Sequence, residues 1–109
     1  MQMGWGAGKT LRGHLDSVLA ISWSACSNYL ATGSVDNTVI IWNALKGLLL
    51  QRIEGIRGFV NGIAFDPLGE FLSVQSNDKT LRLYRSNNKK TPRFFPFFSN
   101  NKIKDYSLE

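Results

Sequence analysis

The chain has 109 residues, a formal net charge of +5 and 43% hydrophobic residues. This length fits one ordinary domain, and the apolar share excludes an intrinsically disordered chain. The single cysteine, Cys26, excludes a disulfide framework and a cysteine-rich zinc site, which agrees with an intracellular protein. The apolar runs are shorter than the roughly 20 residues that a membrane span needs.

In chain order, the predicted elements are short strands joined by turns. Val18–Trp23 and Val39–Trp42 are rich in β-branched and aromatic residues, which favour a half-buried pleated surface. Asp36 and Asn37 predict a tight turn because both tolerate left-handed dihedrals. Asp66–Gly69 predicts another turn, because its proline fixes φ at one position and its glycine accepts a positive φ at another. We expect strands near residues 9–12, 18–23, 29–34, 38–43, 48–53, 60–65, 71–76 and 80–85.

An internal repeat organises most of the chain. A shift of 42 residues aligns Gly13–Asn43 with Gly55–Arg85 without a gap. Apolar positions then coincide with apolar positions, and turn residues with turn residues. A period of about 40–45 residues with four strands in each unit is typical of β-propeller blades.

The residues within these units carry a family resemblance. Leu11–His14, Trp23 and Ala31–Asn43 resemble a WD repeat, with asparagine in place of the final aspartate. Ser34–Asn43 and Phe65–Gly69 are similar, more narrowly, to two related proteins: the histone chaperone HIRA and the middle subunit of the replication-linked chromatin assembly factor. The resemblance covers roughly residues 9–85 and leaves both relatives open.

The resemblance implies an all-β fold of WD-repeat β-propeller blades, one complete four-stranded blade plus most of a second. We divide the chain into a Gly-rich leader (1–8), a first repeat (9–53), a second, degenerate repeat (54–86) and a basic, Phe-rich tail (87–109). Propellers close with roughly four to eight blades, so this is a partial propeller. We expect one of three arrangements: the chain is a piece of a longer protein, it closes a ring by self-association, or another chain supplies the missing blades.

In WD repeats a loop histidine, a strand serine or threonine, a turn aspartate and a strand tryptophan form a hydrogen-bonded chain. By resemblance these residues are His14, Ser34, Asp36 and Trp42. The second repeat has Ser76 and Asp78 at the matching positions. It has isoleucine in place of the histidine, so we expect its network to be incomplete and its blade to be the weaker one.

Two enzyme hypotheses fail on the sequence. Gly8-Lys9-Thr10 resembles the end of a phosphate-binding loop, but Met3 stands where that loop needs its first glycine. Ser34, His14 and Asp36 contain the residue types of a nucleophilic triad, but a serine inside a strand is not exposed to substrate. We therefore expect a non-catalytic protein with no cofactor and no metal site.

The tail leaves two alternatives open. Five basic residues and no acid lie between Ser86 and Lys104, which favours a solvated tail over one that contacts phosphate or an acidic partner. Phe94–Phe98 is either the outer strand of the second blade, confined to an edge by its prolines, or a hydrophobic segment that docks on a partner.

The function implied by resemblance is a protein-interaction scaffold in a nuclear histone chaperone or chromatin assembly subunit. The implied partners are core histones and other assembly subunits, without sequence-specific nucleic acid binding and without a membrane. The alternatives are a WD-repeat scaffold outside chromatin, such as a ubiquitin-ligase adaptor or a trafficking protein, and a fragment without independent function. On the loop-rich face we select six candidate contact residues: Asp16, Val35, Arg57, Phe59, Asn77 and Lys79.

Overall fold

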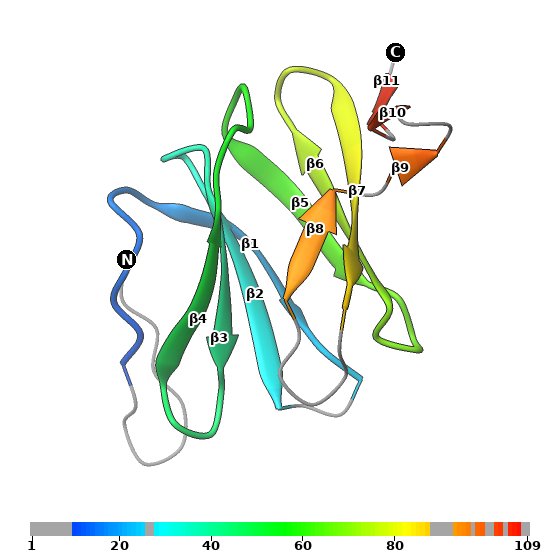
Figure 1. Cartoon of the computed structure of the whole chain (residues 1–109). Coiled ribbons are helices and arrows are strands. Elements are labelled where there is room, and N and C mark those ends of the chain that lie inside the picture. Colours follow the sequence, from blue (N-terminus) through cyan, green and yellow to red (C-terminus); the bar gives the residue numbers. More distant parts are fainter. Residues whose placement is uncertain are drawn as a thin grey trace.

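The computed structural model describes residues 10–25, 28–87, 93–96, 98–99, 102–103 and 105–107, and this part of the chain is built of β-strands without helices (Figure 1). The first sheet consists of β1 (Val18–Trp23), β2 (Tyr29–Ser34), β3 (Val39–Asn43) and β4 (Leu48–Ile53), paired antiparallel in chain order. The second repeats this order with β5 (Val60–Phe65), β6 (Phe71–Ser76) and β7 (Thr80–Ser86). The all-β architecture predicted from the repeat is confirmed.

The tail supplies the outer edge of the second sheet. Strand β8 (Phe94–Pro96) pairs with the end of β7, and β11 (Asp105–Ser107) pairs with its beginning, both antiparallel. The short strands β9 (Phe98–Ser99) and β10 (Lys102–Ile103) pair with each other. Of the two alternatives for the Phe-rich segment, the outer strand is therefore the one observed for Phe94–Pro96, while Phe97 lies outside the described residues.

The outer strands of the two sheets are joined by one side chain. The Gln51 amide on β4 donates to the Phe94 carbonyl at 2.7 Å and accepts from the Phe94 amide at 2.7 Å. A glutamine side chain thereby pairs with β8 as a neighbouring strand would. This contact gives the buried Phe94 a fixed place at the outer end of the interface between the blades.

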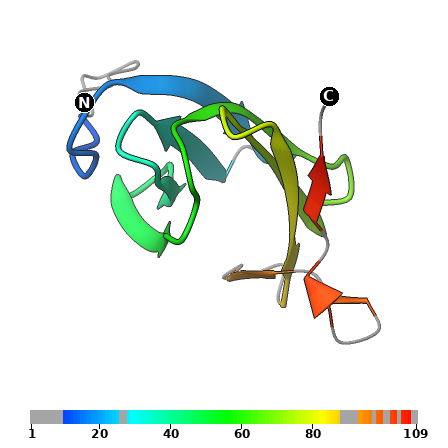
Figure 2. The ribbon, with the colours of Figure 1, turned by 90° about the horizontal axis from the view of Figure 1, so that it is seen from above.

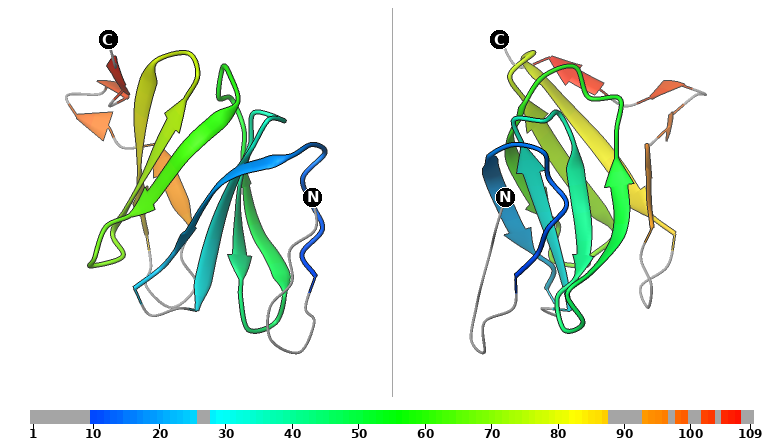
Figure 3. Two further views of the ribbon diagram at one scale, coloured as in Figure 1. Left: turned by 180° about the vertical axis from the view of Figure 1, so that it is seen from behind. Right: turned by 90° about the vertical axis from the view of Figure 1, so that its left-hand side faces the viewer.

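The main hydrophobic core lies between the two sheets. Strands β2 and β3 are nearly continuous buried runs because both of their faces are covered. Strand β5 lies against β1 and β2, and the two sheets face each other across this contact (Figures 2 and 3). The core between the sheets is formed by Ala31, Val39, Ile41, Ile53, Ile56, Val60, Leu72, Val74, Tyr84 and Phe94.

The two blades lie in close contact at a glycine. A Cβ atom at Gly33 would lie 2.3 Å from Cγ1 of the fully buried Val60. No side chain larger than hydrogen fits between β2 and β5 at this position without a shift of one sheet. Gly33 therefore allows the face-to-face packing of the blades.

The leading strand expected at 9–12 is not present in the described residues, which begin at residue 10. Residues 10–14 form no strand, and Leu11 packs on Leu30, Ile40 and Trp42 on the face of the first sheet that points away from the second. A strand needs a neighbour along its edge to accept backbone hydrogen bonds, whereas this segment covers a sheet face. The other expected strands agree with the structure to within a residue at each end.

The same outer face of the first sheet remains partly exposed along β1. Ser22 on β1 faces the second sheet, since its hydroxyl accepts a hydrogen bond from the Phe65 amide at 3.3 Å. The alternating side chains Ile21 and Trp23 therefore point the other way, and they are 46% and 43% exposed. An apolar face of this kind is expected where a propeller would place a further blade.

Candidate interaction surface and its polar networks

All the loops that carry the six candidate contact residues lie at one end of the sheets. Antiparallel pairing places the start of β1, the β2–β3 turn, the β4–β5 connection and the β6–β7 turn together, at the top of Figure 1. Backbone hydrogen bonds tie these loops in pairs, from the Val35 amide to the Ser17 carbonyl at 2.9 Å and from the Asn77 amide to the Phe59 carbonyl at 3.0 Å. Of the six residues, Val35 is half-buried and the others are exposed.

The two hairpin turns on this surface have the same backbone geometry. Asn37 and Lys79, which are 42 residues apart, have φ angles of 66° and 64°. The predicted tight turn at Asp36 and Asn37 is confirmed, and the Asp66–Gly69 turn likewise has Gly69 at φ 73°. A positive φ is unfavourable for lysine. Lys79 adopts it because the strand register and the hydrogen bonds of the hairpin require this turn.

In the first blade a chain of side chains joins the loop, the turn and two strands. The Trp42 indole Nε1 donates to Thr32 Oγ1 at 2.8 Å, and Thr32 Oγ1 lies 2.6 Å from His14 Nε2. His14 Nδ1 lies 3.1 Å from Asp36 Oδ2. Because tryptophan only donates and carboxylate only accepts, a neutral imidazole with its proton on Nδ1 satisfies every atom of this chain.

Asp36 is the charged end of the chain, and its side chain is 6% exposed. Burial raises its pKa, but hydrogen bonds from Thr38, the Leu15 amide and His14 outweigh burial and lower the pKa to about 2. The Leu15 amide donates to Oδ2 at 2.8 Å, and the Thr38 amide donates to Oδ1 at 3.0 Å. The carboxylate thus fixes both the loop before β1 and the turn between β2 and β3.

The strand member of this chain is Thr32, which the sequence analysis did not select. Ser34 instead donates from its hydroxyl to the Asp16 carbonyl at 3.2 Å and accepts from the Asp36 amide at 3.1 Å. The strand register explains the difference: Leu30 lies opposite Trp42, so Thr32 is the diagonal neighbour that the indole reaches. The alternation of β2 places Thr32 and Ser34 on the same face, which is the signal that could have identified Thr32.

The second blade closes its network with a different residue. Asp78 accepts hydrogen bonds from the hydroxyls of Ser76 and Thr80 and from Arg82 Nη2, the last at 3.0 Å. Arg82 Nη1 also donates to Ser76 Oγ at 2.9 Å. The loop histidine is absent from this network, as expected, but a guanidinium four residues further along the chain donates to both Ser76 and Asp78. No side-chain nitrogen or oxygen buried within the described residues lacks a hydrogen bond.

The second network contains an ionised carboxylate, that of Asp78. Hydrogen bonds from Arg82, Ser76 and Thr80 hold the pKa of Asp78 well below its usual range. The side chains of Arg82 and Asp78 are 11% and 21% exposed, so the pair lies at the edge of the interface between the blades. Asp78 is therefore a carboxylate at any physiological pH.

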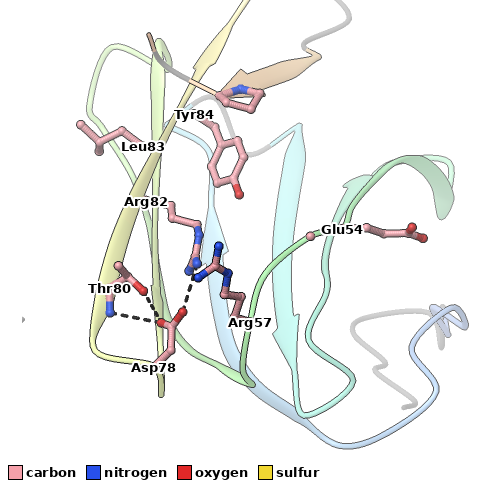
Figure 4. Close-up of a pocket in the computed structure, with 9 residues that line it drawn as sticks. Glu54, Arg57, Asp78, Thr80, Arg82, Leu83 and Tyr84 are labelled. Atoms are coloured by element: carbon pink, nitrogen blue, oxygen red, sulfur yellow. Dashed lines mark hydrogen bonds and ion pairs between the residues drawn. The ribbon is translucent and has the colours of Figure 1, made fainter. Parts of the chain in front are cut away.

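A cavity of about 540 Å³ opens beside this ion pair. Figure 4 shows the guanidinium groups of Arg57 and Arg82 pointing toward one another, with the Tyr84 hydroxyl directed toward them and the Glu54 side chain pointing away. The cavity is lined by Glu54, Gly55, Arg57, Asp78, Thr80, Arg82, Leu83, Tyr84 and Pro96. It therefore lies between the β4–β5 connection of one blade and strands β7 and β8 of the next.

Ser34, His14 and Asp36 are not arranged as a nucleophilic triad. Ser34 is fully buried and bonds to backbone groups and not to His14, whose Nε2 faces Thr32. Gly8, Lys9 and Cys26 lie outside the described residues. Within the described residues, no group of three or more histidine, cysteine or acidic side chains is placed to hold a metal ion, and no helix is long and apolar enough to cross a membrane.

Comparison with known proteins agrees with this architecture. A family model of the CAF1B/HIR1 beta-propeller domain matches residues 2–103. The chain is 42% identical over 86 residues to the B subunit of chromatin assembly factor 1 of Gallus gallus, covering 79% of this chain and 15% of that protein. It is 42% identical over 80 residues to the chromatin assembly factor 1 subunit FAS2 homolog of Oryza sativa subsp. japonica, covering 73% of this chain and 16% of that protein. It is 37% identical over 82 residues to protein HIR1 of Mycosarcoma maydis, covering 75% of this chain and 8% of that protein. The chain thus spans about a sixth or less of the length of the curated relatives it matches.

Proposed function

The chain belongs to the CAF1B/HIR1 β-propeller domain family, and from this premise we propose that its blades act as a non-catalytic protein-interaction scaffold in nuclear chromatin assembly. The observation that carries the proposal is the family match over nearly the whole chain, joined to relatives that are named as chromatin assembly factor subunits and HIR1 proteins. The proposed partners are other chromatin assembly subunits and core histones.

The polar networks support a scaffold more than an enzyme. His14, Asp36 and Asp78 have the chemistry of catalytic groups, but each is engaged in hydrogen bonds that fix loops to strands. A buried polar network of this kind stabilises a single arrangement of the backbone when all of its members are satisfied. Its role is then to hold the loop end of the blades rigid for recognition.

The loop end also has the residue types that protein interfaces favour. Phe59 is an aromatic side chain 38% exposed to solvent, and it lies beside the exposed Arg57 and Asn77. Aromatic and arginine side chains contribute most of the binding energy in many interfaces. We propose this end, with the residues Asp16, Val35, Arg57, Phe59, Asn77 and Lys79, as the partner-binding surface.

Affinity purification from nuclear extract tests the proposal. The full chain carries a tag, and recovered proteins are identified by mass spectrometry. We expect chromatin assembly subunits and core histones, and we expect Phe59→Ala to reduce their recovery. Leu68→Ala is the matched control because Leu68 is 69% exposed on the β5–β6 turn at the opposite end of the blades. Recovery of ubiquitin-ligase or vesicle-coat components in place of chromatin proteins would support the alternative of a scaffold outside chromatin and contradict the proposal.

A further inference from the structure

Two arginines meet at one part of the cavity between the blades. The guanidinium groups of Arg57 and Arg82 lie there beside one carboxylate, that of Asp78 (Figure 4). The second carboxylate of the cavity wall, Glu54, balances the charge of the lining as a whole, but its side chain points away from the guanidinium groups. The part of the cavity where the two arginines meet therefore has one more positive than negative group.

The two arginines are engaged to different extents. Arg82 is nearly buried, and its two terminal nitrogens donate to Ser76 and Asp78. Arg57 is exposed and forms no hydrogen bond or ion pair with any side chain in the described part of the chain. Two like charges that point toward one another repel unless an anion lies between them. The paired Arg82 and Asp78 thus form a fixed wall, and the Arg57 guanidinium group is the one available to bind an anion.

The shape and charge of the cavity favour one class of anion. A carboxylate carries a single negative charge, which balances the one excess positive group where the two arginines meet, and it accepts two parallel hydrogen bonds from a guanidinium group. A phosphate carries up to two negative charges, so the neighbouring Asp78 carboxylate repels it more strongly than it repels a carboxylate. The cavity of about 540 Å³ is far larger than one carboxylate, and Tyr84 and Pro96 add an aromatic and an aliphatic ring to its walls.

We propose that this cavity between the blades binds an aspartate or glutamate side chain of an acidic peptide, with Arg57 as the main contact and the Arg82–Asp78 pair as the wall that orients it. The site shares Arg57 with the partner-binding surface proposed above, but carboxylate binding in the cavity does not require the chromatin function, so the two proposals can fail separately. Arg57 would then act as a binding residue and Arg82 as a positioning residue.

A peptide-binding measurement with one pair of variants tests this site. The probe is a fluorescently labelled peptide of alternating glutamate and glycine, and its fluorescence anisotropy is measured with the full chain. The chain is basic overall and will attract acidic peptides without a specific site, so the comparison is between Arg57→Gln and Arg12→Gln. Both arginines are exposed, and both variants lose one positive charge. Circular dichroism checks that both remain folded.

The expected result is a loss of affinity that depends on position and not on charge alone. Arg57→Gln is expected to weaken binding about tenfold or more, since a charge-assisted hydrogen bond to a carboxylate is among the stronger polar contacts. Arg12→Gln is expected to stay within about twofold of the original chain, as a remote surface charge is largely screened at physiological salt. Equal affinities for the two variants, or no binding by the original chain, would overturn the proposal.

Two competitors distinguish the carboxylate from other anions. The same peptide with phosphoserine in place of glutamate, and a single-stranded DNA oligonucleotide, are each tested for Arg57-dependent displacement of the probe. We expect both to compete more weakly than the unlabelled glutamate peptide. If either competes more strongly and loses this advantage in Arg57→Gln, the cavity is a phosphate site and the carboxylate proposal is wrong. These binding results do not depend on which proteins are recovered from nuclear extract.

Discussion

Thr32→Val isolates the hydroxyl at the centre of the first-blade network. Valine has nearly the same shape as threonine, so the substitution removes the hydrogen bonds without opening a cavity. The Trp42 indole N–H and the Nε2 atom of His14 would both lose the partner that lies 2.8 Å and 2.6 Å away, respectively. Trp42 is 2% exposed and His14 is 7% exposed, so water has little access to either group.

The magnitude follows from these two unpaired groups. A buried donor or acceptor left without a partner costs about 1–3 kcal/mol. Two such groups predict a loss of about 2–6 kcal/mol in the free energy of unfolding, which is a large part of the roughly 5–15 kcal/mol available to a domain. With a urea dependence of about 1–3 kcal/mol per molar, the unfolding midpoint is expected to fall by about 1 M or more.

Urea unfolding of the full chain, followed by tryptophan fluorescence, measures this loss. Thr10→Val is the matched control, because Thr10 is exposed and undergoes the same chemical change. A double-mutant cycle with Trp42→Phe then separates the Trp42–Thr32 hydrogen bond from other effects, and we expect a coupling of about 1 kcal/mol.

Equal losses of stability in Thr32→Val and Thr10→Val would contradict this prediction. If Thr32→Val lowers the free energy of unfolding by no more than Thr10→Val does, the hydroxyl of Thr32 contributes nothing to stability. The polar chain from Trp42 to Asp36 would then be a consequence of the fold and not a cause of its stability.

Three further predictions follow from the electrostatics and the packing. Because the pKa of Asp36 is about 2 in the folded chain and 3.8 is its ordinary value, its ionised form stabilises the chain above about pH 4. About 2 kcal/mol of this stability is lost as pH falls from 4 to 2, and urea unfolding across that range should show a smaller acid loss in Asp36→Asn. Arg82→Met is expected to lower the free energy of unfolding by about 2 kcal/mol through loss of its charged hydrogen bonds, while the exposed control Arg12→Met changes it by less than about 0.5 kcal/mol; equal effects would contradict the second network. Gly33→Ala is expected to cost about 1–3 kcal/mol or more, because its Cβ would lie 2.3 Å from Val60 Cγ1, and a thermal melt unchanged from the original chain would show that the blades can separate freely there.

The strands and turns were predictable because their signals are local. Each of these signals spans only a few residues: a β-branched run, an alternation of apolar side chains, or the turn at Asp36 and Asn37. The repeat at a shift of 42 residues shows the same pattern a second time. The resemblance to WD repeats, and not these local signals, predicted that His14 and Trp42 belong to one network.

The all-β class, the blade repeat and most strand boundaries could therefore be predicted from the residues alone. The tertiary structure was needed to show that Thr32 and not Ser34 joins Trp42 to His14, because that choice depends on the register between β2 and β3. It also decided that Arg82 completes the second network and that Phe94–Pro96 forms an outer strand. Each of these contacts joins side chains across strands or across blades, and their partners are fixed by packing that no short segment of sequence encodes.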